Sequence, residues 1–453
     1  MKKIAIIGSG AYGSYAASLI SELHPNWEIH IYEVGEKETK DQDEIGFYSE
    51  VKNGHYGGLI KGRYFGYGGA TNKWGGQILT FSDNDFKHPS QYQKEIVELN
   101  KKYKQNVFKK VGIKNDYQEV VLPNGMFTKT GVWLDYFSRN LFKKFKINKL
   151  RQVILHPNHR VCKLTLSERK IAGFEVITDG NTKSICGFDH YILAAGAFES
   201  TRLMMMSGIL KKDVISFSDH INKKAFRIKS GTKIGPIDFR FFIKKFSFIT
   251  TRVIGEKDDV PFFIYPTYNE DFPFFQNLKK LLFARKLSVK LIWSILKDTP
   301  SFIAFMWYFC VLRKLYVHGS WYLVLHIENF KNSGQVALSQ ILDKYNQPGI
   351  SVDFQVSEEA EKMFNELVDE LEVILKKWSV DYERVNDGIH TDKFEDEYHP
   401  CALYSEFASV EEYFNLFDNM LVIHSGVLPH AGGINSTAAA FPLLEEYIRT
   451  KWM

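Results

Sequence analysis

The amino-acid sequence predicts a mixed α/β fold, and three observations support this prediction. Near the N-terminus, an apolar run at residues 3–7 is followed at once by a glycine-rich turn and a helical pattern. A second apolar run, at residues 190–197, ends in small residues and is also followed by a helical pattern. Such alternation of strands and helices indicates a parallel sheet. In the middle of the chain, the strand patterns at 224–230, 237–253 and 319–328 indicate a second part with an antiparallel sheet.

The composition is typical of a globular protein and argues against several classes of function. Of 453 residues, 45% are apolar and 25% charged, with 58 Lys and Arg against 53 Asp and Glu. Because no nucleic-acid motif accompanies this small positive excess, no nucleic-acid partner is expected. The four cysteines form no CxxC pair, which argues against a metal site and favours a reducing, cytoplasmic compartment. No run reaches the roughly 18 to 20 apolar residues that span a bilayer.

The N-terminal glycine-rich turn has the spacing of a dinucleotide-binding loop. It consists of Gly8, Ser9, Gly10, Ala11, Tyr12 and Gly13. A helix is expected over 14–23 and a strand over 27–32, and Glu33 follows 20 residues after Gly13. In a Rossmann-type fold such a loop allows a tight turn and close approach to a pyrophosphate, while the acid binds ribose hydroxyls. All of these loop residues and Glu33 are therefore candidate cofactor contacts.

A second glycine-rich segment runs from Gly54 to Gly76, where nine of 23 residues are glycine. Such a segment gives up side-chain packing for backbone freedom, and its aromatic residues argue against a flexible linker. We expect a loop that lies flat against a large planar ligand; a glycine-rich surface loop is the alternative. The candidate contacts are Gly68, Gly69, Thr71, Asn72, Trp74, Gly75 and Gly76.

The apolar strand at 190–197 follows a β-pair expected at 161–166 and 170–177. Its last residues are small, and small residues at the end of a parallel strand let a cofactor approach the sheet edge where ligands bind in open α/β folds. The candidate contacts in this part of the chain are Val161, Ala195 and Gly196.

Several segments of the chain resemble motifs of the glucose-methanol-choline (GMC) oxidoreductases. They are residues 68–76, 193–203, 219–220, 336–349, 422–429 and 432–437. The resemblance implies an FAD-dependent oxidoreductase that oxidises a hydroxyl of an alcohol or carbohydrate, with a base taking the hydroxyl proton while hydride passes to flavin N5. In the C-terminal motif it implies cofactor contacts at Ser425, Ser436 and Thr437.

The resemblance also indicates two catalytic residues. His399 lies in the segment 398–403, which is similar to the family's Tyr-His-x-x-Gly-Thr motif, and histidine suits a base because its pKa lies near operating pH. Asn435 matches a position that helps to hold the substrate oxygen. The segment departs from the family pattern where Ala402 and Leu403 replace Gly and Thr, and His424 stands where Asp is common.

The resemblance further implies how the flavin is held. Relatives with covalent flavin use a histidine in the glycine-rich segment, but no histidine lies between His55 and His88, so non-covalent FAD is expected. A helix is expected over 435–449, with Asn, Ser and Thr capping its start. In the family, the N-terminus of this helix points at the flavin pyrimidine, where it would stabilise the negative charge of reduced flavin.

The expected organisation has a discontinuous Rossmann-type FAD-binding domain and an α+β substrate domain with an antiparallel sheet. The FAD-binding domain would comprise 1–85, 150–219 and 400–453, the substrate domain 220–399, and a cap or connecting region 86–149. Within the substrate domain, 357–377 predicts an amphipathic surface helix.

Residues 276–314 do not fit the plain family pattern. They contain eight Lys or Arg against one acid, Asp298, and residues 301–312 are almost wholly apolar and rich in aromatics. One interpretation is a lid packed on the substrate domain with solvated lysines. The other is an element that lies in a membrane interface and makes the protein peripheral at the membrane. In that case the substrate could be lipid-linked or delivered at the membrane.

Three alternative functions stay open at this stage. The first is an FAD enzyme without net alcohol oxidation, such as an isomerase or reductase, which the departure at Ala402 and Leu403 keeps in view. The second is a flavin-binding protein with degenerate catalysis, against which His399 counts. The third, a nicotinamide-only dehydrogenase, would not need the second glycine-rich segment. The motifs specify neither the electron acceptor nor the substrate.

Overall fold

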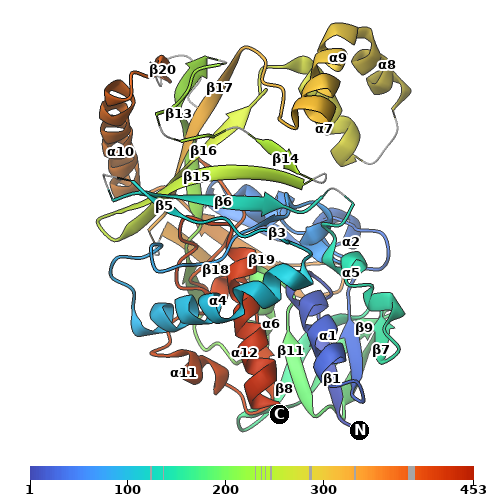
Figure 1. Cartoon of the computed structure of the whole chain (residues 1–453). Helices are drawn as coiled ribbons and strands as arrows, with labels where there is room; N and C mark the ends of the chain where they lie inside the picture. The colour runs from blue at the N-terminus through green and yellow to red at the C-terminus, as the bar shows by residue number, and fades with distance from the viewer. Residues whose placement is uncertain are drawn as a thin grey trace.

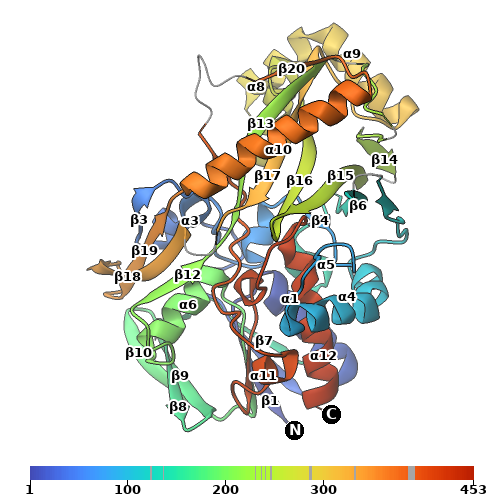
Figure 2. The same ribbon diagram turned by 90° about the vertical axis from the view of Figure 1, so that its left-hand side faces the viewer.

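The computed structural model describes residues 1–452 except 123–124, 136, 230, 236, 240, 245–246, 285–287, 331–332 and 386–392. The chain forms two tiers (Figures 1 and 2). In Figure 1, the lower tier holds a parallel sheet with helices beside it. The upper tier holds a large antiparallel sheet with a long helix at one side and a group of short helices at the other. Both termini lie at the bottom of the lower tier.

A five-stranded parallel sheet forms the centre of the lower tier. Its strands, in spatial order, are β22 (Met420–Val422), β11 (His190–Leu193), β1 (Lys3–Ile7), β2 (Glu28–Tyr32) and β7 (Val153–His156). Alternate residues of β1 enter two different hydrophobic cores, one on each face, which explains why the strand is a continuous apolar run. The sheet confirms the predicted Rossmann-type fold and assembles it from distant parts of the chain.

Helices α1 (Ala11–Leu23), α4 (Gln91–Lys110) and α12 (Phe441–Lys451) contribute to the same core on one face of this sheet. The prediction that the last helix starts near residue 435 is wrong. Residues Ser436–Ala440 form a 3₁₀ turn, and α12 begins at Phe441, where Pro442 fits the first turn because its missing N–H has no partner there. Asn435 makes no side-chain capping bond.

Two smaller sheets flank the parallel one. The antiparallel strands β8 (Arg160–Ser167), β9 (Lys170–Thr178) and β10 (Asn181–Cys186) confirm the predicted β-pair. The predicted strand at 190–197 is shorter, because β11 ends at Leu193 and α6 (Ala197–Met206) begins after Gly196, whose φ is 87°. A four-stranded sheet has the order β12 (Val214–Phe217), β18 (Gly334–Leu342), β19 (Pro348–Phe354) and β3 (Ser49–Gly54).

The upper tier is built on a ten-stranded sheet. Its main path runs β20 (Tyr382–Arg384), β13 (His220–Lys229), β17 (Ser320–Glu328), β16 (Val260–Tyr268), β15 (Ser247–Lys257), β6 (Phe127–Trp133) and β4 (Gln77–Ile78). Strands β5 (Val120–Val121), β14 (Phe242–Lys244) and β21 (Glu395–Asp396) pair at its sides. The single strand predicted at 237–253 is wrong, since β14 and β15 are separate strands that pair antiparallel.

Helix α10 (Glu358–Lys377) lies along the upper sheet and confirms the predicted amphipathic helix (Figure 2). Its apolar stripe, including Phe364 and Leu371, packs into the core of the upper tier. At the other end of this sheet, α7 (Pro273–Ala284), α8 (Val289–Lys297), α9 (Thr299–Trp307) and a π-helical turn (Tyr308–Leu312) form a helical projection. Among the described residues no single helix qualifies as a membrane span, although α8 and residues 299–312, bent by 82°, do so as a pair.

The remaining elements are short. They are α2 (Gln42–Ile45), α3 (Gly57–Lys61), α5 (Leu141–Lys144), α11 (Val410–Phe414), and the 3₁₀ turns Gly69–Asn72, Ile147–Lys149 and Ser425–Val427.

Candidate active site

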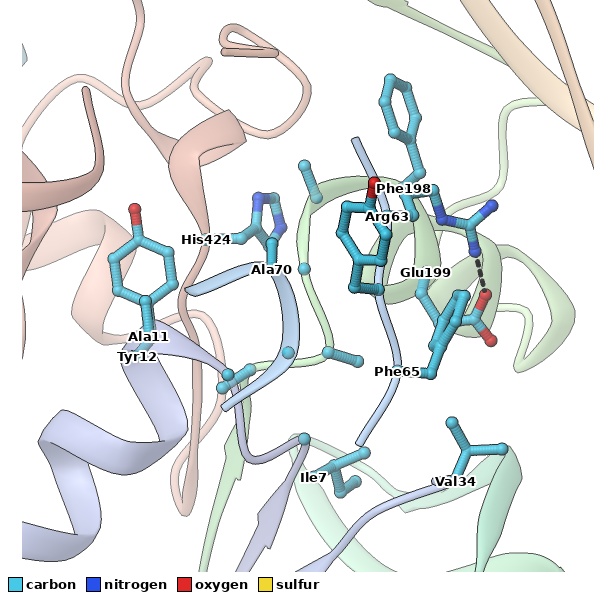
Figure 3. A pocket seen from close by; sticks show the side chains of 18 of the residues that line it. Ile7, Ala11, Tyr12, Val34, Arg63, Phe65, Ala70, Phe198, Glu199 and His424 are labelled. Atoms are coloured by element: carbon cyan, nitrogen blue, oxygen red, sulfur yellow. Dashed lines mark hydrogen bonds and ion pairs between the residues drawn. The ribbon is translucent and has the colours of Figure 1, made fainter. Parts of the chain in front are cut away.

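A cleft with an empty volume of about 1330 Å³ opens at the carboxyl edge of the parallel sheet. We call it the sheet-edge cleft. Figure 3 shows that its walls come from the β1–α1 loop, the turn before α6, the second glycine-rich segment and the C-terminal region. The predicted contacts that line it are Gly8, Gly10, Ala11, Tyr12, Glu33, Gly69, Thr71, Trp74, Val161, Ala195, Gly196, Ser425 and Thr437. Its shape therefore joins motifs that are far apart in the sequence.

The other predicted contacts stand behind this lining. The backbone N–H and hydroxyl of Ser9 donate to Glu33 at 2.9 and 2.7 Å. The Asn72 amide donates to the carbonyls of Tyr67 and Gly69, both at 3.0 Å. Those that do not line the cleft are Ser9, Gly13, Gly68, Asn72, Gly75, Gly76 and Ser436. Ser9 and Asn72 thus hold the shape of the loops that form the wall.

The three glycines of the first loop have different roles. A Cβ atom on Gly8 would lie 2.5 Å from the Ala194 carbonyl oxygen, and on Gly13 it would lie 2.0 Å from the Gly8 carbonyl oxygen. Both glycines are therefore required by the packing of the protein itself. A Cβ on Gly10 would meet nothing within 4 Å. Because Gly10 lines the cleft at the N-terminus of α1, its missing side chain leaves room for a ligand beside the helix's free N–H groups.

Glu33 lies at the end of β2, where the spacing predicted an acid. Its carboxylate accepts backbone N–H groups of Ser9 at 2.9 Å and of Gly35 and Gly66 at 3.1 Å. Glu33 therefore connects the two glycine-rich loops and presents an acceptor at one end of the cleft.

His424 is the buried residue that stands where the resemblance leads one to expect Asp. It lines the cleft, is fully buried, and neither ring nitrogen has a hydrogen-bond partner among the described residues (Figure 3). Burial lowers the pKa of His424 to about 3, so the imidazole is neutral at ordinary pH. A neutral imidazole with two unsatisfied nitrogens fits a polar, hydrogen-bonding ligand in this cleft.

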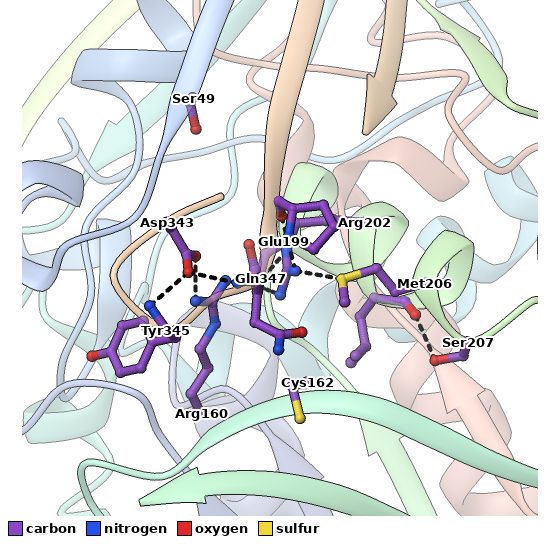
Figure 4. Close-up of polar contacts among 12 residues, drawn as sticks. Ser49, Arg160, Cys162, Glu199, Arg202, Met206, Ser207, Asp343, Tyr345 and Gln347 are labelled. Carbon is purple, nitrogen blue, oxygen red and sulfur yellow. Dashed lines mark hydrogen bonds and ion pairs between the residues drawn. The ribbon is translucent and has the colours of Figure 1, made fainter. Parts of the chain in front are cut away.

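A group of arginines that the sequence analysis did not identify lies at one side of the cleft, and Arg63 and Arg160 line it. Arg63 pairs with Glu199 at 3.1 Å (Figure 3). Arg202 pairs with Glu199 at 2.6 Å, and Arg160 pairs with Asp343 (Figure 4). Burial raises the pKa of Glu199, but Arg202, Arg160 and Arg63 outweigh it and lower that pKa to about 2. The signal in the sequence that could have revealed this group was the spacing of Glu199 and Arg202 on a buried helix face. Asp343 reaches Arg160 only through the turn between β18 and β19.

A larger cavity of about 1810 Å³ lies under the upper sheet, and we call it the upper cavity. Arg252, Phe263, His326, Glu397 and Asn435 are among its lining residues. Phe263 stacks on the His326 ring with centroids 4.2 Å apart. The cavity is thus a polar and aromatic chamber.

His399 and Asn435 lie where the two openings meet. The Asn435 side-chain nitrogen is 3.4 Å from His399 Nε2, and Asn435 lines the upper cavity. Tyr398 and Pro400, on either side of His399, line the sheet-edge cleft. The structure therefore brings together the two predicted catalytic residues at the boundary between a cofactor-sized cleft and a second chamber.

The position and charge state of His399 follow from its surroundings. Its backbone N–H donates to the Asp219 carboxylate at 2.9 and 3.0 Å, and the Asp219 carboxylate also accepts from the hydroxyl of Tyr56 at 2.6 Å. Asp219, His220 and His399 place possible ligand atoms within 4.8 Å of one another. Burial and the neighbouring His220 lower the pKa of His399 to about 3, so its ring is neutral at ordinary pH.

The departure at Ala402 has a conformational explanation. Ala402 has a φ of 56°, in the left-handed region that favours glycine. Ala402 therefore has the backbone conformation that favours glycine, the residue that the resemblance leads one to expect there.

No family model matches the sequence, and a comparison with curated proteins also gives no match. Solved structures do match. Pyridoxine 4-oxidase from Mesorbium loti has 14% identity and a TM-score of 0.57, and the match covers 99% of each chain. A formate oxidase has 12% identity and a TM-score of 0.53, covering 99% of this chain and 98% of the other. At such identities the likeness shows the fold. It extends over the whole chain, upper tier included.

Proposed function

We propose that this chain is an FAD-dependent oxidoreductase of the GMC type that oxidises a hydroxyl group of an alcohol or carbohydrate. The observation that carries the proposal is the junction, where His399 and Asn435 meet between the sheet-edge cleft and the upper cavity. The whole-chain similarity to two structures whose names describe oxidases supports it. So do the motifs that resemble this family.

The residues of the sheet-edge cleft fit a non-covalently bound FAD. The N-terminus of α1 at Gly10 would face the pyrophosphate, and Glu33 would accept the ribose hydroxyls. The neutral His424 would serve a polar edge of the flavin ring. When bound, FAD would supply the acceptor for a hydride.

The chain's own residues would handle the proton. A hydroxyl in the upper cavity would lie between His399 and Asn435, where the Asn435 amide can donate to its oxygen and His399 Nε2 can take its proton. Since His399 is neutral, it needs no prior deprotonation. Its backbone bond to Asp219 holds it in place as the proton moves.

The first test is the absorption spectrum of the purified protein before and after acid precipitation. Flavin that passes to the supernatant would support non-covalent FAD. Anaerobic bleaching by a panel of alcohols and sugars, with product analysis, would then separate net oxidation from isomerisation or reduction. Well-folded protein that contains no flavin and cannot be reconstituted with FAD would contradict the proposal.

A further inference from the structure

The helical projection is unusual because its large apolar side chains face outward. Helix α9 and the π-helical turn, residues 299–312, contain no buried residue. Trp293 is 60% exposed, Ile303 61% and Trp307 57%. The other exposed apolar side chains are Val289, Leu296, Phe302, Met306, Val311 and Leu312. So many exposed large apolar side chains on one short segment indicate an interaction surface.

The packing of the projection argues against a lid closed on the upper sheet. Phe272, Phe274 and Ile295 form a small core of its own, to which α7, α8 and α9 contribute or pack. A lid would bury its apolar face against the sheet beneath it. Here most of the large apolar side chains of α8 and α9 stay exposed, although Ile295, Phe302 and Phe305 contact the small core.

The charges around this face fit an anionic surface. Lys290, Lys297 and Arg313 are exposed, and none of them forms an ion pair within the part of the chain that the structure describes. Asp298, the acid of this segment, caps α9 by accepting the Ser301 N–H at 3.3 Å. Tryptophans beside lysines are typical of elements that lie at the boundary of headgroups and acyl chains.

We propose that α8, α9 and the π-helical turn bind the surface of an anionic lipid bilayer, with the apolar face inserted and the basic residues at the headgroups. This interaction does not depend on the flavin chemistry. Each lysine or arginine near such a surface contributes roughly fivefold in partitioning. The protein is then peripheral, held by a surface element and not by a span.

The test is co-sedimentation of the full chain with vesicles of phosphatidylcholine plus phosphatidylglycerol, compared with phosphatidylcholine alone. We expect binding that prefers the anionic vesicles, falls with salt, and shifts tryptophan emission to the blue. Ile303→Glu should lower the partition at least about tenfold, because it places a charge in the inserted face. Val373→Glu is the matched control, since Val373 on α10 is 66% exposed.

The contribution of the charges is tested by the double variant Lys290→Gln/Lys297→Gln, which should lower the partition to anionic vesicles roughly 25-fold. Lys362→Gln on α10 is the control. All of these positions are exposed, so unchanged melting temperatures show that folding is preserved. Absence of binding to anionic vesicles would overturn the proposal. So would a wild-type dimer in gel filtration that Ile303→Glu converts to monomer, since the face would then bind a second copy.

A second, independent observation concerns Arg252 in the upper cavity. Arg252 is only 3% exposed, yet no carboxylate pairs with it among the described residues. It donates to the Gly433 carbonyl at 3.1 Å, to the Asn435 side-chain oxygen at 2.7 Å and to the Gln77 side-chain oxygen, and its guanidinium lies over the Phe263 ring, but its Nε has no partner. Glu397, an acid of the cavity wall, is engaged by His326 at 3.3 Å and by Asn222 at 2.7 Å.

A buried guanidinium with an unused donor is costly unless an anion completes it. We infer that Arg252 binds an anionic group of the substrate, a carboxylate or phosphate, next to the hydroxyl held by Asn435. The assignment of this anionic group to the substrate rests on the proposed function. The binding of an anion to Arg252 does not.

The probe is acetate, titrated calorimetrically into the purified protein, with acetamide as the neutral isostere. We expect acetate to bind, acetamide to bind at least about tenfold more weakly, and Arg252→Met to lose the preference. Arg227→Met, half-exposed on β13, is the control and should keep it. Equal binding of acetate to wild type and Arg252→Met would overturn the inference. Because heat is measured, this outcome is distinct from a missing flavin, which would refute the proposed function alone.

Discussion

The sheet-edge cleft and the upper cavity meet at His399, yet they are built in different ways. The cleft is lined by glycines of the loops together with aromatic side chains such as Phe65 and Trp74, and its arginines Arg63 and Arg160 are each paired with an acid. The upper cavity is lined by side chains from the strands of the upper sheet, and Arg252 there has no carboxylate partner in the described structure. The comparison teaches that acids compensate the arginines of the cleft, whereas the upper cavity leaves the charge of Arg252 without an acid among the described residues.

The largest effect is expected at the junction of the two. His399→Asn should slow flavin reduction about 10²–10⁴-fold, the usual contribution of a general base. The measurement is anaerobic stopped-flow with whichever alcohol bleaches the wild-type flavin. His88→Asn, at an exposed histidine, is the control and should leave the rate unchanged. If His399→Asn reduced its flavin as fast as the wild type, His399 would have no role as the base.

The paired charges of the cleft should matter for stability. Glu199→Gln leaves Arg63 and Arg202 without their acid, so we expect a loss of about 3–5 kcal/mol in the free energy of unfolding. Glu383→Gln, which breaks an exposed pair with Arg227, should cost at most about 1 kcal/mol. Urea denaturation of the three proteins measures both values.

The same network gives a pH dependence. The folded pKa of Glu199 is about 2, below its ordinary value of 4.5. Its stabilisation is therefore fully present above pH 4.5 and is lost as the pH falls through about 2. Between these values the wild type should lose stability more steeply than Glu199→Gln. Parallel pH profiles would show that Glu199 is not held ionised by the arginines.

Two glycines of the first loop separate fold from cofactor binding. Gly13→Ala should cost about 1–3 kcal/mol of unfolding free energy, because its Cβ meets the Gly8 carbonyl at 2.0 Å. Gly10→Ala has open space and should leave the melting temperature of the flavin-free protein unchanged, while FAD affinity falls at least about tenfold. Thermal melts and fluorescence titration with FAD distinguish the two. Equal FAD affinity in Gly10→Ala would mean that no ligand approaches there.

The smallest effect is expected at Ala402. Because its φ is 56°, Ala402→Gly relieves a left-handed conformation and should stabilise the protein by about 1 kcal/mol. Ala360→Gly, in the first turn of α10, should instead destabilise by a similar amount. Denaturant midpoints decide between the two signs. A destabilised Ala402→Gly would show that this backbone position is not strained.

Local motifs were predictable because their physics is local. The strand, loop and helix of residues 3–23 follow from apolar patterning and glycine geometry over a short stretch, and α10 follows from its period and its Ser357 cap. The division into β14 and β15 was missed because both strands contain apolar residues that read as one run. The start of the last helix was predicted too early, at residue 435, because capping residues can equally begin a 3₁₀ turn.

The sequence by itself determined the Rossmann-type core, the glycine loops and, through resemblance, the pair His399 and Asn435. Only the tertiary structure decided what surrounds them. Arg252 reaches Asn435 across 183 residues, and Arg160 reaches Asp343 across the same separation. It also decided that the apolar face of α9 points outward. The physical reason is that periodicity encodes which residues avoid water, whereas sheet pairing between distant segments decides which charges meet.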